Sequence, residues 1–207
     1  AYMTRGVFEW PAGTPIERVT EYTYDEAGNR LTETVRGGGT DPDATTTMTY
    51  DAAGRVQSVT DPEGKTTTFT YNLMGQVLTM TDAEDRVWEN RYDDMGRLTA
   101  RVDPLGSETR LSYDELGNLV RVTDAEGNST SHEYDHNKRL VKTIDSLGNE
   151  VLSEYDLDGN LALHVDAELK ETQYEYDLDG RLATMRDGDG NVTAYEYEDA
   201  ADDLCTS

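Results

Sequence analysis

The sequence predicts an all-β protein made of tandem antiparallel β-hairpins, and three observations support this fold class. Tyr recurs every 21 residues from Tyr50 to Tyr197. Each period holds two turn signals, and the segments between them are about six residues long, which is too short for helices of ordinary length. The repeats supply about sixteen such strands, and open sheets with this many strands tend to curl. We therefore expect a curved or spiralling sheet.

The first turn signal directly follows the repeated Tyr, as in the segment from Tyr50 to Arg55. Asp at the first turn position can accept hydrogen bonds from backbone amides, and Gly at the fourth can adopt the left-handed conformation of a type I turn with a bulge. Lys138 departs from this pattern by replacing Gly, and Asn72 and Glu198 do so by replacing Asp. We predict a structural repeat role for Tyr24, Tyr50, Tyr71, Tyr92, Tyr113, Tyr134, Tyr155, Tyr176, Tyr197, Gly54, Gly75, Gly96, Gly117, Gly159 and Gly180.

The second turn signal begins eleven residues after the Tyr, as in Asp61-Pro62-Glu63-Gly64. Pro at the second position suits a type I turn because its φ is already fixed near the required value. The same Asp-x-x-Gly pattern begins at Asp103, Asp124, Asp145 and Asp187. Each unit is therefore predicted to be two short strands and two turns.

The strand that ends at Tyr is predicted to have one buried and one wet face, because alternate side chains point to opposite sides. The Tyr face includes Met48, Phe69 and Trp88, whereas the other face carries Thr, Arg and Glu. Across the first turn, Tyr92 is expected opposite Leu98, and Asp93 opposite Arg97, as stabilising pairs. The returning strand breaks strict alternation, which indicates a bulge that switches faces.

The charge balance excludes nucleic acid and anionic membranes as default partners, since 43 acidic and 18 basic residues give a net charge of −25. The composition favours disorder, so a folded chain must use many of its 13 Tyr as core residues. The longest apolar stretches, such as Val77 to Met80, are far too short to insert in a membrane. With Cys205 as its one cysteine, the chain can form no internal disulfide.

The repeat pattern divides the chain into three parts. Residues 1–21 form a lead-in segment, residues 22–198 the repeat array with an insertion loop at 36–45, and residues 199–207 a tail. The insertion contains three consecutive glycines and an Asp-Pro pair, which indicates a surface loop. Because residue 1 is Ala and the last residues form no recognisable stop, we expect a fragment of a longer chain. Its unpaired edge strands favour edge-to-edge self-association.

The Tyr-Asp-x-x-Gly-Arg-Leu units resemble the rearrangement-hotspot (RHS) repeats, also called YD-repeats. Eight or nine copies in register over residues 22–198 carry this resemblance. It implies a β-hairpin ribbon wound into a hollow shell, as in bacterial polymorphic toxins, the C components of insecticidal toxin complexes and the animal teneurins. In the bacterial members the shell sequesters a C-terminal toxin domain. The family's self-cleaving region carries a longer Asp-Pro-x-Gly-Leu signature, but Asp103 to Gly106 is followed by Ser107 and is interpreted as an ordinary turn.

Three segments resemble metal-binding motifs of two kinds. His132-Glu133-Tyr134-Asp135-His136 matches the zinc protease pattern, which requires both His on one helical face, yet the repeat phase places His132 in a strand and His136 in a turn. Asp156 to Asn160 and Asp187 to Asn191 resemble the start of a calcium loop, but both lack Gly at the sixth position. We interpret them as solvated acidic turns, with weak divalent binding left open. No catalytic, cofactor-binding or metal-ligating residue is predicted.

The sequence therefore predicts a non-enzymatic structural fragment of a shell that encapsulates or presents another domain, here a secreted toxin cargo. Its expected partners are the remaining repeats or the enclosed toxin domain of the parent polypeptide, and its expected location is secreted or at the cell surface. The alternative is an extracellular repeat module that binds a carbohydrate or a protein. Exposed tyrosines such as Tyr195 could stack on sugars, although packing in the ladder is the favoured role.

Overall fold

The computed structural model describes residues 3–8, 16–36 and 42–197, and side chains are described from residue 19 onwards within these ranges. All regular elements in these ranges are strands, and each is three to nine residues long. Their bounds are β1 Met3–Phe8, β2 Ile16–Tyr24, β3 Arg30–Arg36, β4 Ala44–Tyr50, β5 Val56–Thr60, β6 Thr66–Tyr71, β7 Val77–Thr81, β8 Val87–Tyr92, β9 Leu98–Val102, β10 Glu108–Tyr113, β11 Leu119–Thr123, β12 Ser129–Tyr134, β13 Leu140–Ile144, β14 Glu150–Tyr155, β15 Leu161–Val165, β16 Glu171–Tyr176, β17 Leu182–Arg186 and β18 Val192–Ala194.

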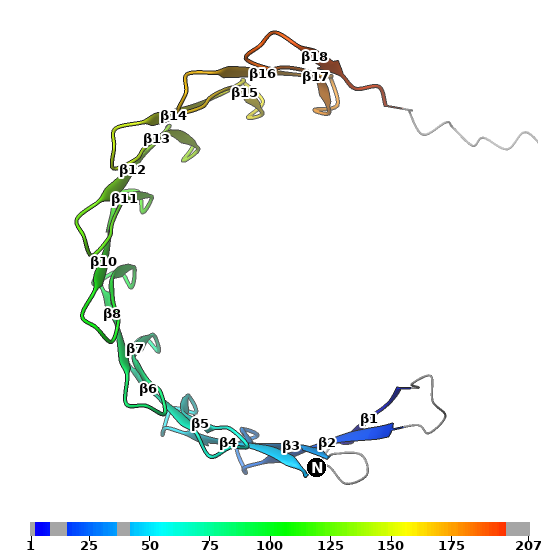
Figure 1. Cartoon of the computed structure of the whole chain (residues 1–207), viewed down its shortest axis with the longest axis vertical. Coiled ribbons are helices and arrows are strands. Elements are labelled where there is room, and N and C mark those ends of the chain that lie inside the picture. The colour runs from blue at the N-terminus through cyan, green and yellow to red at the C-terminus, as the bar shows by residue number, and fades with distance from the viewer. Residues whose placement is uncertain (1–2, 9–15, 37–41, 198–207) are drawn as a thin grey trace, which may run out of the picture. The chain divides into compact units, whose positions relative to one another are not determined.

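The chain divides into two units, Ala1–Glu108 with β1 to β9 and Thr109–Ser207 with β10 to β18. Within each unit, consecutive strands pair antiparallel, and the ribbon runs from hairpin to hairpin (Figure 1). The predicted all-β hairpin array with its 21-residue period is therefore confirmed. The described residues contain 18 strands rather than about sixteen, partly because β1 pairs with β2 ahead of the repeats.

Each hairpin that carries a Tyr has the same register. In β14 and β15, Tyr155 lies opposite Leu161, and the next pair is Glu154 with Leu163, so one residue of β15 is extra. The same shift occurs beside Tyr50, Tyr92 and Tyr176. The predicted bulge and the predicted pairing of Tyr with an aliphatic residue are thus confirmed. The bulge explains why the returning strands do not alternate strictly.

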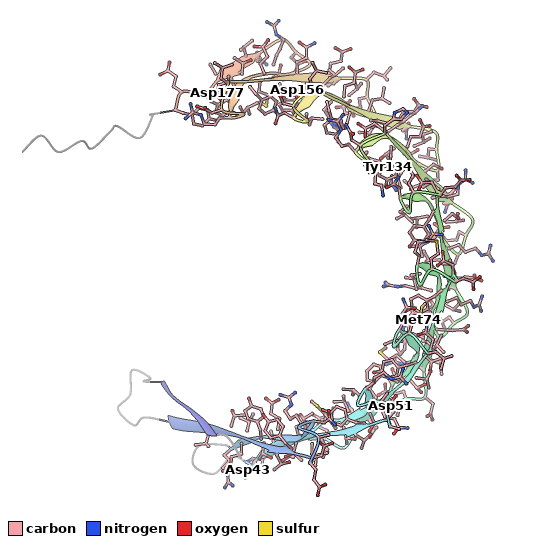
Figure 2. The ribbon with its side chains drawn as sticks, turned by 180° about the vertical axis from the view of Figure 1, so that it is seen from behind. Asp43, Asp51, Met74, Tyr134, Asp156 and Asp177 are labelled. Carbon is pink, nitrogen blue, oxygen red and sulfur yellow. The ribbon has the colours of Figure 1, made fainter. Side chains whose placement is uncertain are left out.

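Burial is shallower than the sequence predicts. The Tyr face is largely half-buried. On the opposite face the residue before each repeated Tyr is exposed, whereas Glu89, Ser131 and Leu152 are half-buried. Among the described side chains only Ala100 is buried, at 4% exposure. Each unit is a single layer of sheet with side chains on both faces (Figure 2). Because the described residues of a unit provide no second layer, its Tyr side chains are covered only by their neighbours along the ribbon. Two of the repeated tyrosines, Tyr24 and Tyr197, are 43% and 44% exposed.

The expected tail lies outside the described residues, as do residues 1–2 and 9–15 of the lead-in segment and 37–41 of the insertion loop. The rest of the lead-in segment forms β1 and the start of β2. Strand β3 ends at Arg36 and β4 begins at Ala44, so these two strands bracket the insertion. Glu198, where the turn pattern departs, also falls outside the described ranges. The division of the chain into these three parts stays a prediction.

Candidate functional site

The turn after each repeated Tyr is built around one carboxylate. Oδ1 of Asp51 accepts hydrogen bonds from the backbone amides of Ala53 and Arg55, both within 3.0 Å. The backbone N–H of Asp51 donates to the carbonyl of Arg55, and that of Gly54 donates to the carbonyl of Asp51. Gly54 adopts φ of +77°, a left-handed conformation that costs Gly little. The predicted type I turn with a bulge is confirmed.

The same turn geometry persists where the sequence departs from the pattern. Lys138 takes φ of +62° in place of Gly, and its amide still donates to the carbonyl of Asp135. The side chain of Asn72 accepts the two amide bonds that Asp accepts elsewhere. Two further turns, which begin at Asp82 and Asp166, lack the Asp-x-x-Gly pattern because non-glycine residues occupy their fourth positions. The recurring Asp eleven residues after the Tyr could have revealed them.

The fifth turn residue binds the outer oxygen of the same carboxylate. It is Arg in several turns, and Nε of Arg139 lies 2.6 Å from Oδ2 of Asp135. It is Asn in others, and Nδ2 of Asn160 lies 3.0 Å from Oδ2 of Asp156. The pairing of Asp93 with Arg97 that the sequence predicts is also present, at 2.7 Å.

These contacts lower the pKa of the carboxyl groups of Asp135 and Asp156 because they stabilise the ionised form. For Asp135 the backbone amide of Arg139 has the largest effect on the pKa, and the guanidinium of Arg139 adds to it. For Asp156 the side-chain amide of Asn160 lowers the pKa most. Asp135 and Asp156 thus stay charged and hydrogen-bonded at neutral pH.

The arginine of one turn reaches the Tyr of the next repeat. The guanidinium carbon of Arg139 lies 4.5 Å from the ring centre of Tyr155, and Arg181 lies 4.8 Å from that of Tyr197. Arg55 lies 4.7 Å from the ring centre of Tyr71 and also donates to the carbonyl of Asn72. We call the turn after one repeated Tyr, together with the next repeated Tyr along the chain, a joint. An Arg joint stacks a cation on an aromatic ring across two repeats.

The Tyr hydroxyl makes a second connection between repeats. Tyr155 donates to the carbonyl of Leu140, at 3.0 Å, and that Leu is the residue paired with the preceding Tyr at the bulge. The equivalent bond, always to a residue 15 positions earlier, is formed by Tyr71, Tyr92, Tyr134, Tyr176 and Tyr197. Tyr50 donates instead to Arg30, 20 positions earlier, because the insertion lengthens that repeat. Sequence spacing reveals the Tyr period but gives no sign of this bond.

The remaining predicted residues occupy corresponding places. Tyr24 ends β2, and Tyr113 ends β10. The turn glycines take left-handed φ between +76° and +97°, and these are Gly54, Gly75, Gly96, Gly117, Gly159 and Gly180. The structural repeat role of these tyrosines and glycines remains our proposal, which mutagenesis must test.

The two metal-like motifs adopt the repeat structure. His132 lies in strand β12, where its Nδ1 is 3.2 Å from the hydroxyl of Thr143, whereas His136 lies in the following turn. The residues therefore do not share a helical face. Asp156 and Asp187 accept bonds from their own turn amides and from Asn160 and Asn191. Within the described ranges, no cluster of three or more metal-ligating side chains is found, nor any helix able to cross a membrane.

Comparison with solved structures returns matches at low sequence identity. A crystal structure of TcdB2-TccC3-Cdc42 matches with a TM-score of 0.46 and 16% identity over 94% of this chain. TcdB2-TccC3 without its hypervariable C-terminal region matches with a TM-score of 0.45 and the same identity and coverage. The chain spans 14% of the length of each. A porin-like protein from Bacteroides uniformis matches with a TM-score of 0.35 and 15% identity, over 93% of this chain and 96% of that protein.

Comparison at the level of sequence identifies the family. No curated protein matches the chain. The family model for the teneurin YD-shell matches twice, over residues 8–152 and 43–204, and so accounts for nearly all the repeats. This match agrees with the Tyr-Asp turns and the hairpin register, and it supports a structural, shell-forming role. The chain therefore belongs to the teneurin YD-shell family.

Proposed function

We propose that this chain is a non-enzymatic segment of a YD-repeat shell that encloses or presents another domain, and that the enclosed domain is a secreted toxin. Membership of the YD-shell family supports the structural part of this proposal. The turn carboxylates support it too, because turn amides and Arg or Asn side chains already engage them. The partners are then the remaining repeats and the enclosed domain, in a polypeptide that is secreted or at the cell surface.

One observation carries the proposal: the Tyr face is half-buried although the described residues of each unit form one layer. Joints hold neighbouring repeats together through hydroxyl bonds and stacked arginines, so the ribbon can be ordered without a second layer on its Tyr face. A sheet face that is partly apolar and left uncovered by its own unit is suited to lie against other protein. A shell that surrounds a domain would provide that contact.

Limited proteolysis of the parent polypeptide tests this function. We expect the enclosed domain to resist a protease when the repeats are present and to be cleaved when it is expressed alone. Replacing Tyr with Phe at Tyr134, Tyr155 and Tyr176 together should loosen the ribbon and restore cleavage. Equal cleavage of the domain with and without the repeats would contradict enclosure.

The alternative function is a repeat module that binds a carbohydrate or a protein outside the cell. The exposed turn leucines favour a protein ligand, since Leu157 and Leu178 are fully exposed at neighbouring turns. A glycan array and a pull-down with the purified chain would separate the two ligand classes. Specific sugar binding would favour the carbohydrate module over the shell.

A further inference from the structure

The Arg joints show how this fold holds a guanidinium group. In three repeats the arginine lies 4.5 to 4.8 Å from the ring centre of the next Tyr while it is bonded to the Asp of its own turn. Arg55 also donates to the backbone carbonyl that follows that Tyr. Carboxylate, aromatic face and carbonyl together form a recurrent guanidinium site within the chain.

Three joints have Asn at the arginine position, namely Asn29, Asn118 and Asn160. Because Asn is shorter than Arg and uncharged, it bonds the turn Asp without covering the next Tyr ring. Hollows lie at two of these joints. One, of about 610 Å³, is lined by Asn29 and Tyr50, and the other, of about 670 Å³, by Asn160 and Tyr176.

A cation of the chain itself approaches each of the three Asn joints. Arg30 Nη2 lies 3.8 Å from the sulfur of Met48, which lines the first hollow. Nζ of Lys138 donates to the carbonyl of Leu116, inside the turn that contains Asn118. At the third joint, Nη1 of Arg139 lies 3.6 Å from the position that a Cβ on Gly159 would take. Among the described residues, however, no arginine or lysine pairs with Asp156 or Asp158 or lies over the Tyr176 ring.

The hollow at Asn160 is also the more acidic of the two. Asp156, Asp158, Glu175, Asp177 and Asp179 line it, and Arg181 neutralises part of this charge by pairing with Asp177 and Asp179. Asp25 and Asp51 are the acidic residues of the hollow at Asn29, and Arg55 pairs with Asp51. Burial, together with the charge of Asp156, raises the pKa of Tyr176, which agrees with a negative potential at this ring. Figure 2 shows Asp156 and Asp177 at neighbouring turns of the ribbon.

We propose that the hollow between the Asp156–Asn160 turn and Tyr176 binds an arginine side chain of another polypeptide segment. The guest guanidinium would stack on the Tyr176 ring and bond Asp156 or Asp158, as the chain's own arginines do in sister repeats. Leu178 lines the same hollow and is fully exposed. Its side chain would therefore pack against an apolar residue beside the guest arginine. The partner segment is therefore basic and apolar.

This inference rests on the proposed shell role only for the source of the arginine, which we assign to the enclosed domain. Binding itself can be tested on the 207-residue chain without any cargo. Protease protection of the parent polypeptide, in turn, is measured without an added peptide. If one experiment fails, the result of the other can therefore still be interpreted.

The test is an NMR titration of the chain with the blocked tripeptide acetyl-Leu-Arg-Leu-amide. We expect saturable shifts of the Tyr176 ring and of the Asn160 side-chain amide. The same peptide with citrulline in place of arginine should bind about tenfold more weakly, because it keeps the shape but loses the charge. Equal binding of the two peptides, or the absence of a saturable shift at Tyr176, would overturn the proposal.

Three variants sharpen the titration. Asn160→Arg gives the joint its own guanidinium, as in its neighbours, and should abolish the shifts at Tyr176. Asn118→Arg makes the same change two repeats earlier and should leave the titration unchanged. Asp158→Asn alters an exposed turn residue without touching the turn hydrogen bonds and should weaken binding severalfold. Unaltered affinity in Asn160→Arg would show that the peptide binds elsewhere and would reject the site.

Discussion

Two consecutive joints in the second unit differ in one side chain. Asp135–Arg139 with Tyr155 and Asp156–Asn160 with Tyr176 share the same turn bonds, and both Tyr hydroxyls donate to a carbonyl 3.0 Å away. Only the first places a guanidinium over the next ring. The comparison teaches that Asp and Tyr set the backbone of the repeat, while the fifth turn residue decides whether the neighbouring ring is covered.

Removing the rings should have the largest effect and should distinguish the joints. We expect Tyr155→Ala to lower the free energy of unfolding by about 2 kcal/mol, since it removes a half-buried ring, a hydroxyl bond and a stacked cation. Tyr176→Ala should cost less by about 0.5 to 1 kcal/mol because no arginine covers that ring. Urea denaturation followed by circular dichroism would measure both. A larger loss at Tyr176 would contradict the ranking.

Backbone conformation should matter equally at every turn that needs a left-handed residue. Gly159 has φ of +97°, and its nearest neighbour to an added Cβ is the guanidinium of Arg139 at 3.6 Å, which is ordinary contact. We therefore expect Gly159→Ala to cost about 1 kcal/mol through conformation alone. Leu169, at φ of +63°, offers the reverse test, since Leu169→Gly should raise the melting temperature. A lower melting temperature in both variants would indicate that side-chain contacts dominate at these turns.

Removing only the Tyr hydroxyl should destabilise the two joints by equal amounts. Tyr155→Phe and Tyr176→Phe each lose a bond of the same length to the carbonyl at the preceding bulge. Both should lose about 1 kcal/mol, within the range for one hydrogen bond. Thermal melts of the two variants side by side would show this. Clearly unequal losses would mean that the ring environments, rather than the hydroxyl bonds, control these positions.

Lowering the pH should destabilise both joints. The pKa values of Asp135 and Asp156 are lowered from 3.8, by the backbone amide of Arg139 and by the side-chain amide of Asn160 respectively. A lowered folded-state pKa stabilises the fold above pH 3.8, and this stabilisation is lost as the pH falls through the folded-state value. Carbon-detected NMR titration should place both midpoints below 3.8. A midpoint above 3.8 at either residue would show that its turn bonds are absent in solution.

The sequence predicted what lies within one repeat. The phase of Tyr, the Asp-capped turn at Asp51, the pairing of Tyr92 with Leu98 and the bulge all follow from local pattern. It did not predict what joins two repeats, because the bond from Tyr155 to Leu140 and the stacking of Arg139 depend on the spacing of neighbouring hairpins. It also overestimated burial, since periodicity shows which face is apolar but not whether a second layer covers it.

A double-mutant cycle on Arg139 and Tyr155 tests the central claim most directly. The cycle compares the free energies of unfolding of the unmodified chain, Arg139→Ala, Tyr155→Ala and the combined alanine variant. We predict a coupling energy of about 0.5 to 1 kcal/mol between Arg139 and Tyr155, and none in the matched cycle on Asn160 and Tyr176. Coupling that is zero at Arg139, or equal in the two cycles, would contradict the claim that the arginine ties one repeat to the next.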